Sequence, residues 1–270
     1  MRRIGPITSC VIVAVIAVVA VGIAPLRAEG PWADWRQARP FVVRADFSLA
    51  GFEPLLTELQ QLQKDLVDRL EIPPSAEPIE IYLFQSEAAY RAYLLARYPQ
   101  APTRRALFIK SGGPGQVFAY RSEEFEIDVR HETTHALLHA SLTGVPLWLD
   151  EGLAEYFEVA PQDRLRNKPH LRTLKWNLWM GLAPRLSGLE EKRDVAEMGK
   201  REYMFAWAWV HYLLHGPPEV QSELIAYLRL SQSGPPREPL SQRLRRCLPD
   251  PEKRLAQHFM RPSASKNWSG

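Results

Sequence analysis

One short stretch near the middle of the chain restricts its local structure more than any other. Residues 131–135 read His-Glu-Thr-Thr-His, and we expect them to lie in a helix over residues 124–141. Residues four apart lie on one face of a helix, so the imidazoles of His131 and His135 point the same way and can hold one metal ion. Glu132 lies one step around the helix, where its carboxylate can take a proton from a metal-bound water. The stretch therefore predicts a metal site with a general base beside it.

A second acidic stretch follows soon after this helix. Residues 143–146 interrupt it, and residues 148–156 read Trp-Leu-Asp-Glu-Gly-Leu-Ala-Glu-Tyr, which we expect to form the next helix. Glu151 lies 16 residues after His135, near enough to fold back as a third ligand. Two His, one Glu and a water form a known catalytic zinc set. Glu155 lies one turn further on the same face, and we expect it to accept the free ring N–H of a zinc-bound histidine.

The H-E-x-x-H motif followed by W-L-D-E-G-L-A-E-Y resembles the gluzincin metallopeptidases, the clan of thermolysin and aminopeptidase N. It is most similar to the small bacterial peptidase-like domains of that clan. Members carry a W-L-x-E-G-x-A segment whose Glu is the third zinc ligand, a role that falls on Glu151. Residues 203–213 resemble a helix that opens with a catalytic tyrosine in aminopeptidase N relatives, so Tyr203 takes an oxyanion-binding role. The resemblance covers about residues 104–216 and implies a hydrolase that uses Zn²⁺ to cleave peptide bonds.

Two departures limit what the resemblance implies. Aminopeptidases of the clan carry an upstream G-x-M-E-N motif whose Glu anchors the free amine of the substrate, and the comparable residues 112–117 contain no Glu. Endopeptidase and exopeptidase activity therefore both stay open. The metzincin pattern needs Gly at position 138 and His at 141, where this chain has Leu138 and Ser141. His139 lies about 12 Å along the helix axis from His131, so we expect a polar helix residue outside the metal site.

The first residues have the features of a targeting segment. Arg2 and Arg3 precede an apolar run over residues 11–24, and a small residue follows at Ala28, which is the order of a secretory signal. We expect a cleaved signal peptide over residues 1–28, with an uncleaved membrane tether through residues 7–24 as the alternative. Both predict an extracytoplasmic catalytic part, either periplasmic, secreted or membrane-anchored.

Composition limits the other function classes. The chain is 46% apolar and 24% charged, as expected for a globular protein that buries a real core. Its formal net charge is +3 and its one compact basic run is residues 243–246, so we expect no nucleic-acid partner. Without Cys10 the chain keeps only Cys247, which excludes an intramolecular disulfide and a cysteine metal cluster. The expected partner is a peptide or protein substrate.

The remaining patterns predict an α+β fold with two lobes. A small N-terminal α/β lobe over residues 29–145 leads into the His helix. Its lead-in is residues 31–40, its strands are expected over residues 41–47, 79–84, 105–110 and 116–120, and its helices over residues 52–70 and 86–97. Residues 116–120 fit equally well a plain core strand or an edge strand that lines the cleft and pairs with an extended peptide.

The second lobe is expected to be helical over residues 146–262, followed by a polar tail over residues 263–270. It carries Glu151, Glu155 and Tyr203, and we expect the active-site cleft between the two lobes. Its later helices are expected over residues 170–180, 203–214, 219–230, 239–246 and 255–260. Trp176 and Trp179 are three residues apart, and we expect them to pack beneath the site.

Two other interpretations compete with an enzyme. The first is a non-catalytic exported domain that binds zinc or a partner, but a purely structural metal site needs no base such as Glu132. The second is a membrane-tethered helical interaction module in which the motif is a coincidence, and the segment around Glu151 argues against it.

Overall fold

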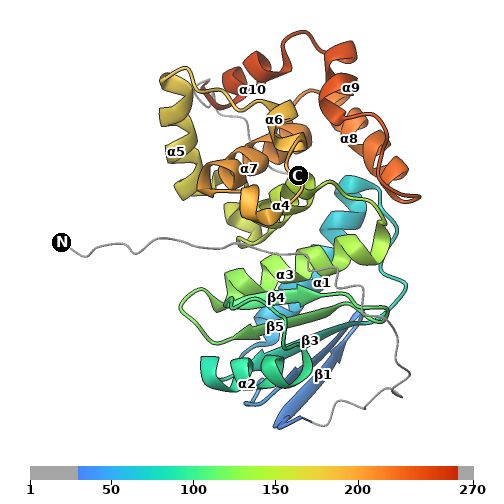
Figure 1. Cartoon of the computed structure of the whole chain (residues 1–270), viewed down its shortest axis with the longest axis vertical. Helices are drawn as coiled ribbons and strands as arrows, with labels where there is room; N and C mark the ends of the chain where they lie inside the picture. The colour runs from blue at the N-terminus through green and yellow to red at the C-terminus, as the bar shows by residue number, and fades with distance from the viewer. Residues whose placement is uncertain (1–29, 261–270) are drawn as a thin grey trace, which may run out of the picture.

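A computed structural model describes residues 30–260, which form an α+β fold, as predicted (Figure 1). The strands are β1 (Asp34–Ala38), β2 (Phe41–Ala45), β3 (Ile79–Phe84), β4 (Ala106–Ile109) and β5 (Gln116–Tyr120). The α-helices are α1 (Glu53–Leu70), α2 (Glu87–Arg97), α3 (Phe125–Ser141), α4 (Leu147–Phe157), α5 (Lys168–Trp179), α6 (Leu186–Glu190), α7 (Lys200–His215), α8 (Pro218–Ser231), α9 (Leu240–Cys247) and α10 (Pro251–Met260). The short 3-10 helices are η1 (Pro161–Arg166) and η2 (Val195–Glu197).

The five strands form one mixed sheet in the order β1-β2-β3-β5-β4. The central pairs β2/β3 and β3/β5 are parallel, whereas the outer pairs β1/β2 and β4/β5 are antiparallel. In the register of the central pair, Tyr82 lies opposite Phe118, and their rings stack at a centroid distance of 5.0 Å. Both edges of the sheet are therefore short antiparallel strands.

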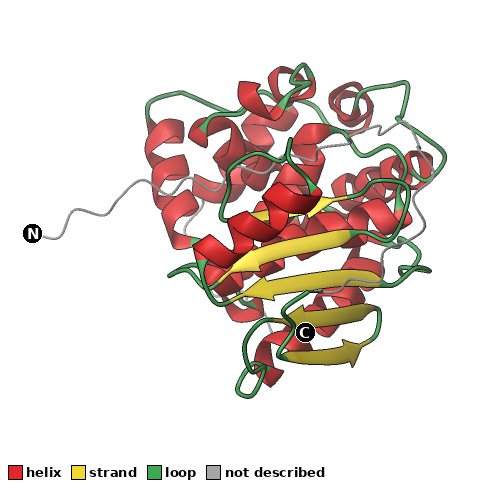
Figure 2. Ribbon diagram, turned by 60° about the horizontal axis from the view of Figure 1, so that its bottom comes forward, coloured by secondary structure: helices red, strands yellow, loops and turns green. Residues whose placement is uncertain are grey.

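Alternation along the strands separates two cores, because successive side chains point to opposite faces of a sheet. In β3, Ile81 and Leu83 face the layer of α1 and α3, whereas Tyr82 and Phe84 face α2. Figure 2 shows the strands side by side, with helices in front of and behind the sheet. The core under α3 continues into the helical region, so α3 is the element that joins the two halves of the molecule.

The helices follow local sequence signals. One face of α1 is a buried leucine stripe at helical spacing, made of Leu55, Leu59, Leu62, Leu66 and Leu70. The Ser86 hydroxyl accepts the backbone N–H of Ala89 and caps α2. Helix α7 is apolar on nearly every side and is correspondingly buried, and it packs closely on α4. This contact brings α4 against the centre of the helical region.

Two expectations were wrong, and one open alternative is resolved. Residues 34–38 form the edge strand β1, although their exposed polar side chains gave no strand pattern. Strand β5 lies inside the sheet, so the edge beside α3 is β4, and the core-strand alternative for residues 116–120 holds. Trp176 and Trp179 are not packed beneath the site, because their side chains are 63% and 67% exposed.

Some predictions fall outside the part of the chain that the structure describes. These are the signal peptide over residues 1–28, the alternative tether over residues 7–24 and the polar tail over residues 263–270. Among residues 30–260, no helix is long and apolar enough to span a bilayer. The two-lobe division and the cleft between the lobes stay predictions.

A histidine cluster connects α7 to α10 and to α4. The His211 Nδ1 atom lies 3.1 Å from His258 Nε2, and the Tyr156 hydroxyl lies 2.7 Å from His215 Nε2. Burial lowers the pKa of His211 well below its usual value, and burial together with the charge of Arg69 lowers the pKa of His215 to about 4. Packing in this part of the core therefore favours neutral imidazoles.

We expect the fold to lose stability as the pH falls from about 6.5 to about 4, because unfolded His215 binds a proton more readily than folded His215. Above this range both states hold a neutral ring and the effect vanishes. Substitution His215→Asn should reduce the acid-induced loss in free energy of unfolding by about 2 kcal/mol. Urea unfolding of both chains at neutral and acidic pH measures it, and an unchanged pH dependence would contradict it.

Candidate metal site

Helix α3 buries a long run of polar side chains between the sheet and α4. It packs on β4 and β5 on one side and on α4 on the other (Figure 1). Residues 128–135, which include the whole His-Glu-Thr-Thr-His stretch, are buried. Charged side chains are almost never fully buried unless they are paired or bind an ion. The burial of this stretch therefore points to a built polar site.

The structure brings the three predicted ligands together. The Nε2 atoms of His131 and His135 each lie 3.8 Å from one oxygen, Oε2 of Glu151. The three residues are the first of three groups whose ligand atoms lie within 4.8 Å of one another. A tetrahedral zinc ion with bonds of 2.0–2.2 Å separates its ligand atoms by roughly 3.3–3.6 Å. These buried His and Glu side chains could hold a metal ion.

The ligand atoms of the His131, His135 and Glu151 group form no hydrogen bonds with the described residues. His131 Nε2, His135 Nε2 and both carboxylate oxygens of Glu151 have no hydrogen-bond partner among residues 30–260. Glu132 Oε2, beside them, also lacks one. Buried polar atoms are rarely left unpaired, because each costs about 1–3 kcal/mol. A cation accounts for the ligand atoms together, so the residues present fit a metal ion.

Each histidine is held from behind by a carboxylate. The His131 Nδ1 atom lies 2.8 Å from Glu158 Oε2, and the His135 Nδ1 atom lies 3.0 Å from Asp150 Oδ2. A ring that donates its Nδ1–H to a carboxylate keeps the Nε2 lone pair for a metal. The hydrogen bond to Glu158 therefore fixes the orientation and tautomer that a metal site needs at His131, and Asp150 lies at ion-pair distance behind His135.

Sequence reasoning assigned this supporting role to Glu155 and missed Asp150 and Glu158. The Glu155 carboxylate instead contacts His170 Nε2 at 2.6 Å, although it stays within 4.8 Å of the Glu158 and His131 ligand atoms. Two sequence signals could have identified the true partners. Asp150 directly precedes the third ligand, and Glu158 follows that ligand by seven residues, which is two helical turns.

Two further groups could also hold an ion. One joins His135 and His139 to Asp150, and the other joins His131 to Glu155 and Glu158. Each contains a pair that already forms a hydrogen bond, His139 with Asp150 in the first and His131 with Glu158 in the second, whereas the ligand atoms of the Nε2 group have no hydrogen-bond partner among the described residues. The Nε2 group is therefore the better site. His139 is not part of the Nε2 group, and its Nε2 atom lies 3.0 Å from Asp150 Oδ2 and supports that carboxylate.

Several carboxyl groups lie close together in this buried site. Burial raises the pKa of Glu151 to about 8, of Glu132 to about 7 and of Glu158 to about 7. Burial alone would lower the pKa of His131, but Glu151 and Glu158 raise it well above its usual value. Each shift shows carboxyl groups that lack sufficient positive charge nearby. A bound cation would favour their ionised forms and lower their pKa values.

Two other predicted features lie on neighbouring elements. The backbone of Phe108 in β4 lies close enough to Glu132 to offset part of the rise in its pKa, so the edge strand runs beside the expected base. Tyr203 lies in the first turn of α7, with a buried side chain, and α7 packs on the helix that carries Glu151. The oxyanion role of Tyr203 stays a prediction.

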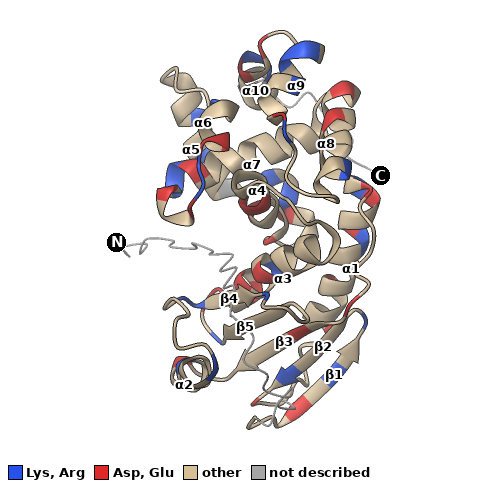
Figure 3. Cartoon of the chain, turned by 45° about the vertical axis from the view of Figure 1, so that its right-hand side comes forward, with Lys and Arg blue, Asp and Glu red and all other residues tan. Residues whose placement is uncertain are grey.

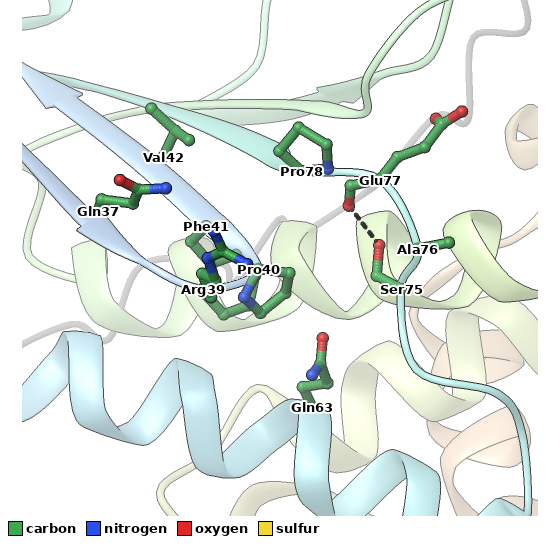
Figure 4. Close-up of a pocket in the computed structure, with 10 residues that line it drawn as sticks. All are labelled: Gln37, Arg39, Pro40, Phe41, Val42, Gln63, Ser75, Ala76, Glu77 and Pro78. Carbon is green, nitrogen blue, oxygen red and sulfur yellow. Dashed lines mark hydrogen bonds between the residues drawn. The ribbon is translucent and has the colours of Figure 1, made fainter.

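A cavity of about 410 Å³ lies elsewhere, at the turn between β1 and β2 (Figure 4). Figure 4 shows Gln63 of α1 on one side of it and the segment of Ser75 and Glu77 on another. This is the edge of the sheet opposite β4, and none of the predicted site residues lines the cavity. The cavity is therefore separate from the candidate metal site.

Substitution Glu158→Gln should weaken metal binding by about 10–100-fold, because it removes the charge that holds the Nδ1–H of His131. Substitution Glu155→Gln is the matched control and should have a smaller effect, because the Glu155 carboxylate contacts His170. Competition with a chelating dye measures both affinities. Equal losses in the two variants would show that Glu158 has no special role.

Comparison with known proteins identifies no family for this chain. No family model matches the chain, and no curated protein matches it. The assignment of a function therefore rests on the site itself.

Proposed function

We propose that the chain is an exported, gluzincin-like zinc metallopeptidase that hydrolyses peptide bonds. One observation carries the proposal. The unpartnered Nε2 atoms of His131 and His135 and the unpartnered carboxylate of Glu151 lie within 4.8 Å of one another in a buried place. Glu132, with an unpartnered oxygen of its own, lies beside them. Two imidazoles and one carboxylate are a donor set that suits catalytic zinc, which keeps its fourth position open.

The contacts support a separate chemical role for each residue of the site. When bound, zinc supplies a Lewis acid that polarises the scissile carbonyl and makes water more acidic. Glu132 takes the proton of the attacking water and later delivers it to the leaving amine nitrogen. Glu158 holds the His131 imidazole in the orientation that this chemistry needs, and Asp150 lies 3.0 Å behind the His135 ring. An intact base at this place favours catalysis over the alternative of a non-catalytic zinc-binding or partner-binding domain.

The edge strand supports a peptide as the substrate. Among the strands in residues 30–260, β4 pairs only with β5, so none of these strands covers its outer edge. An extended peptide can add to such an edge through backbone hydrogen bonds. The Phe108 backbone lies close to Glu132, so a peptide along β4 would lie next to the base. Tyr203 is proposed to donate a hydrogen bond to the oxyanion.

The test is a peptide-library digestion by the zinc-loaded chain, with products identified by mass spectrometry. We expect cleavage that a chelator stops and added zinc restores. Substitution Tyr203→Phe should slow it by about 10²–10³-fold, because one oxyanion donor is removed. A folded, zinc-loaded chain that cleaves no peptide would favour the non-catalytic alternative.

A further inference from the structure

The C-terminal end of α5 and the turn after it expose four large apolar side chains within seven residues. Trp176, Trp179, Met180 and Leu182 form what we call the α5 tip, and each is more than half exposed. The rings of Trp176 and Trp179 contact each other at a centroid distance of 5.1 Å. Single exposed apolar residues are ordinary, whereas a contiguous exposed patch indicates an interaction surface. Helix α5 lies at the outer margin of the helical region (Figure 1).

The segment that carries the α5 tip is basic. Residues 164–185 contain no Asp or Glu but several Lys and Arg, and Figure 3 shows charged residues of both signs on the ribbon around α5. Arg172, Lys175 and Arg185 are exposed. None of the three forms an ion pair with another residue in the range 30–260. Their charge is therefore available to a negatively charged surface.

We propose that the α5 tip docks on an anionic lipid bilayer, with the two tryptophans in the interfacial layer. Tryptophan is enriched there because its ring is apolar and its indole N–H is polar. Met180 and Leu182 supply apolar area, while Lys175 and Arg172 attract anionic headgroups. An apolar patch alone would suit a protein partner equally well. The acid-free basic flank is the observation that selects the anionic surface.

The same helix leads back to the metal site. His170, in the first turn of α5, contacts Glu155 at 2.6 Å. Trp179 is nine positions after His170 in the helix, about 13–14 Å along the axis. Docking of the α5 tip would therefore hold the metal site close to the bilayer surface. The lipid contact itself does not depend on the proposed peptidase activity.

The test uses tryptophan fluorescence of the full chain with vesicles that contain phosphatidylglycerol and brominated phosphatidylcholine. Bromine quenches only those tryptophans that reach the bilayer. We expect quenching in wild type and its loss in the variant Trp176→Ala/Trp179→Ala. Substitution Trp35→Ala is the matched control, because Trp35 is 62% exposed on β1, and it should leave the quenching unchanged. All variants share residues 1–29, so lipid attachment through that segment is common to them.

Charge and self-association are tested in the same samples. Substitution Lys175→Glu, with both tryptophans intact, should lose quenching. Wild type should also lose it on vesicles of phosphatidylcholine that contain the brominated lipid but no phosphatidylglycerol. Equal quenching in wild type and the double tryptophan variant, or on neutral and anionic vesicles, would overturn the proposal. So would no quenching at all. A wild-type dimer that the double variant separates would identify the patch as a protein interface instead.

Discussion

Replacement of Glu132 by Gln is expected to lower the rate of peptide hydrolysis by about 10³–10⁴-fold, in the upper part of the range for general acid–base catalysis, while the metal ion stays bound. Glutamine has nearly the same shape, but it cannot carry a proton from water to the leaving amine. Initial rates and metal content should be measured on the same preparation.

The matched control for this variant is Glu126→Gln, an exposed carboxylate on the same helix. It should keep the wild-type rate. Full activity in Glu132→Gln would show that the base lies elsewhere and that the mechanism is wrong. Loss of the metal together with the activity would instead make Glu132 a ligand.

Replacement of Gly152 by Ala is expected to destabilise the fold by about 1–3 kcal/mol and to weaken metal binding. A Cβ atom on Gly152 would lie 2.7 Å from the carbonyl oxygen and 2.9 Å from the carbonyl carbon of Ala206 in α7. Both are backbone atoms, so α4 would have to move away from α7. Glu151 precedes Gly152 on α4 and would move with it.

The expected loss of stability is informative, because Gly→Ala in a helix interior otherwise stabilises a protein by about 1 kcal/mol. Substitution Gly188→Ala in α6 is the control, since nothing lies within 4 Å of its Cβ position. Urea unfolding with and without metal compares the two variants. A stability gain in Gly152→Ala equal to that in Gly188→Ala would contradict the packing described for α4 and α7.

Local spacing explains what could be predicted. The leucines of α1 and the spacing of His131 and His135 each lie within one helix, where the helical period determines which side chains share a face. Glu151 followed from its motif, and the structure brings it to the two histidines. These features needed no knowledge of how the elements pack.

The missed features depend on packing between elements. Whether Glu155 or Glu158 reaches His131 depends on how α4 is turned against α3, which the spacing of residues along the chain does not define. The position of β5 inside the sheet depends on β4 pairing outside it. Strand β1 was missed because it is an exposed edge with polar side chains. Trp176 and Trp179 were expected to pack beneath the site because they are three residues apart on a helix, yet both are exposed.

The most direct test of the central claim is the zinc content per chain of wild type, Glu132→Gln and His135→Ala, each folded and supplied with metal. The site predicts about one zinc ion in wild type and in Glu132→Gln, because Glu132 is the base and not a ligand. It predicts none in His135→Ala, because one of the three atoms that converge on the site is lost. Wild type without zinc, or His135→Ala with the wild-type content, would contradict the assignment of His131, His135 and Glu151 as a metal site.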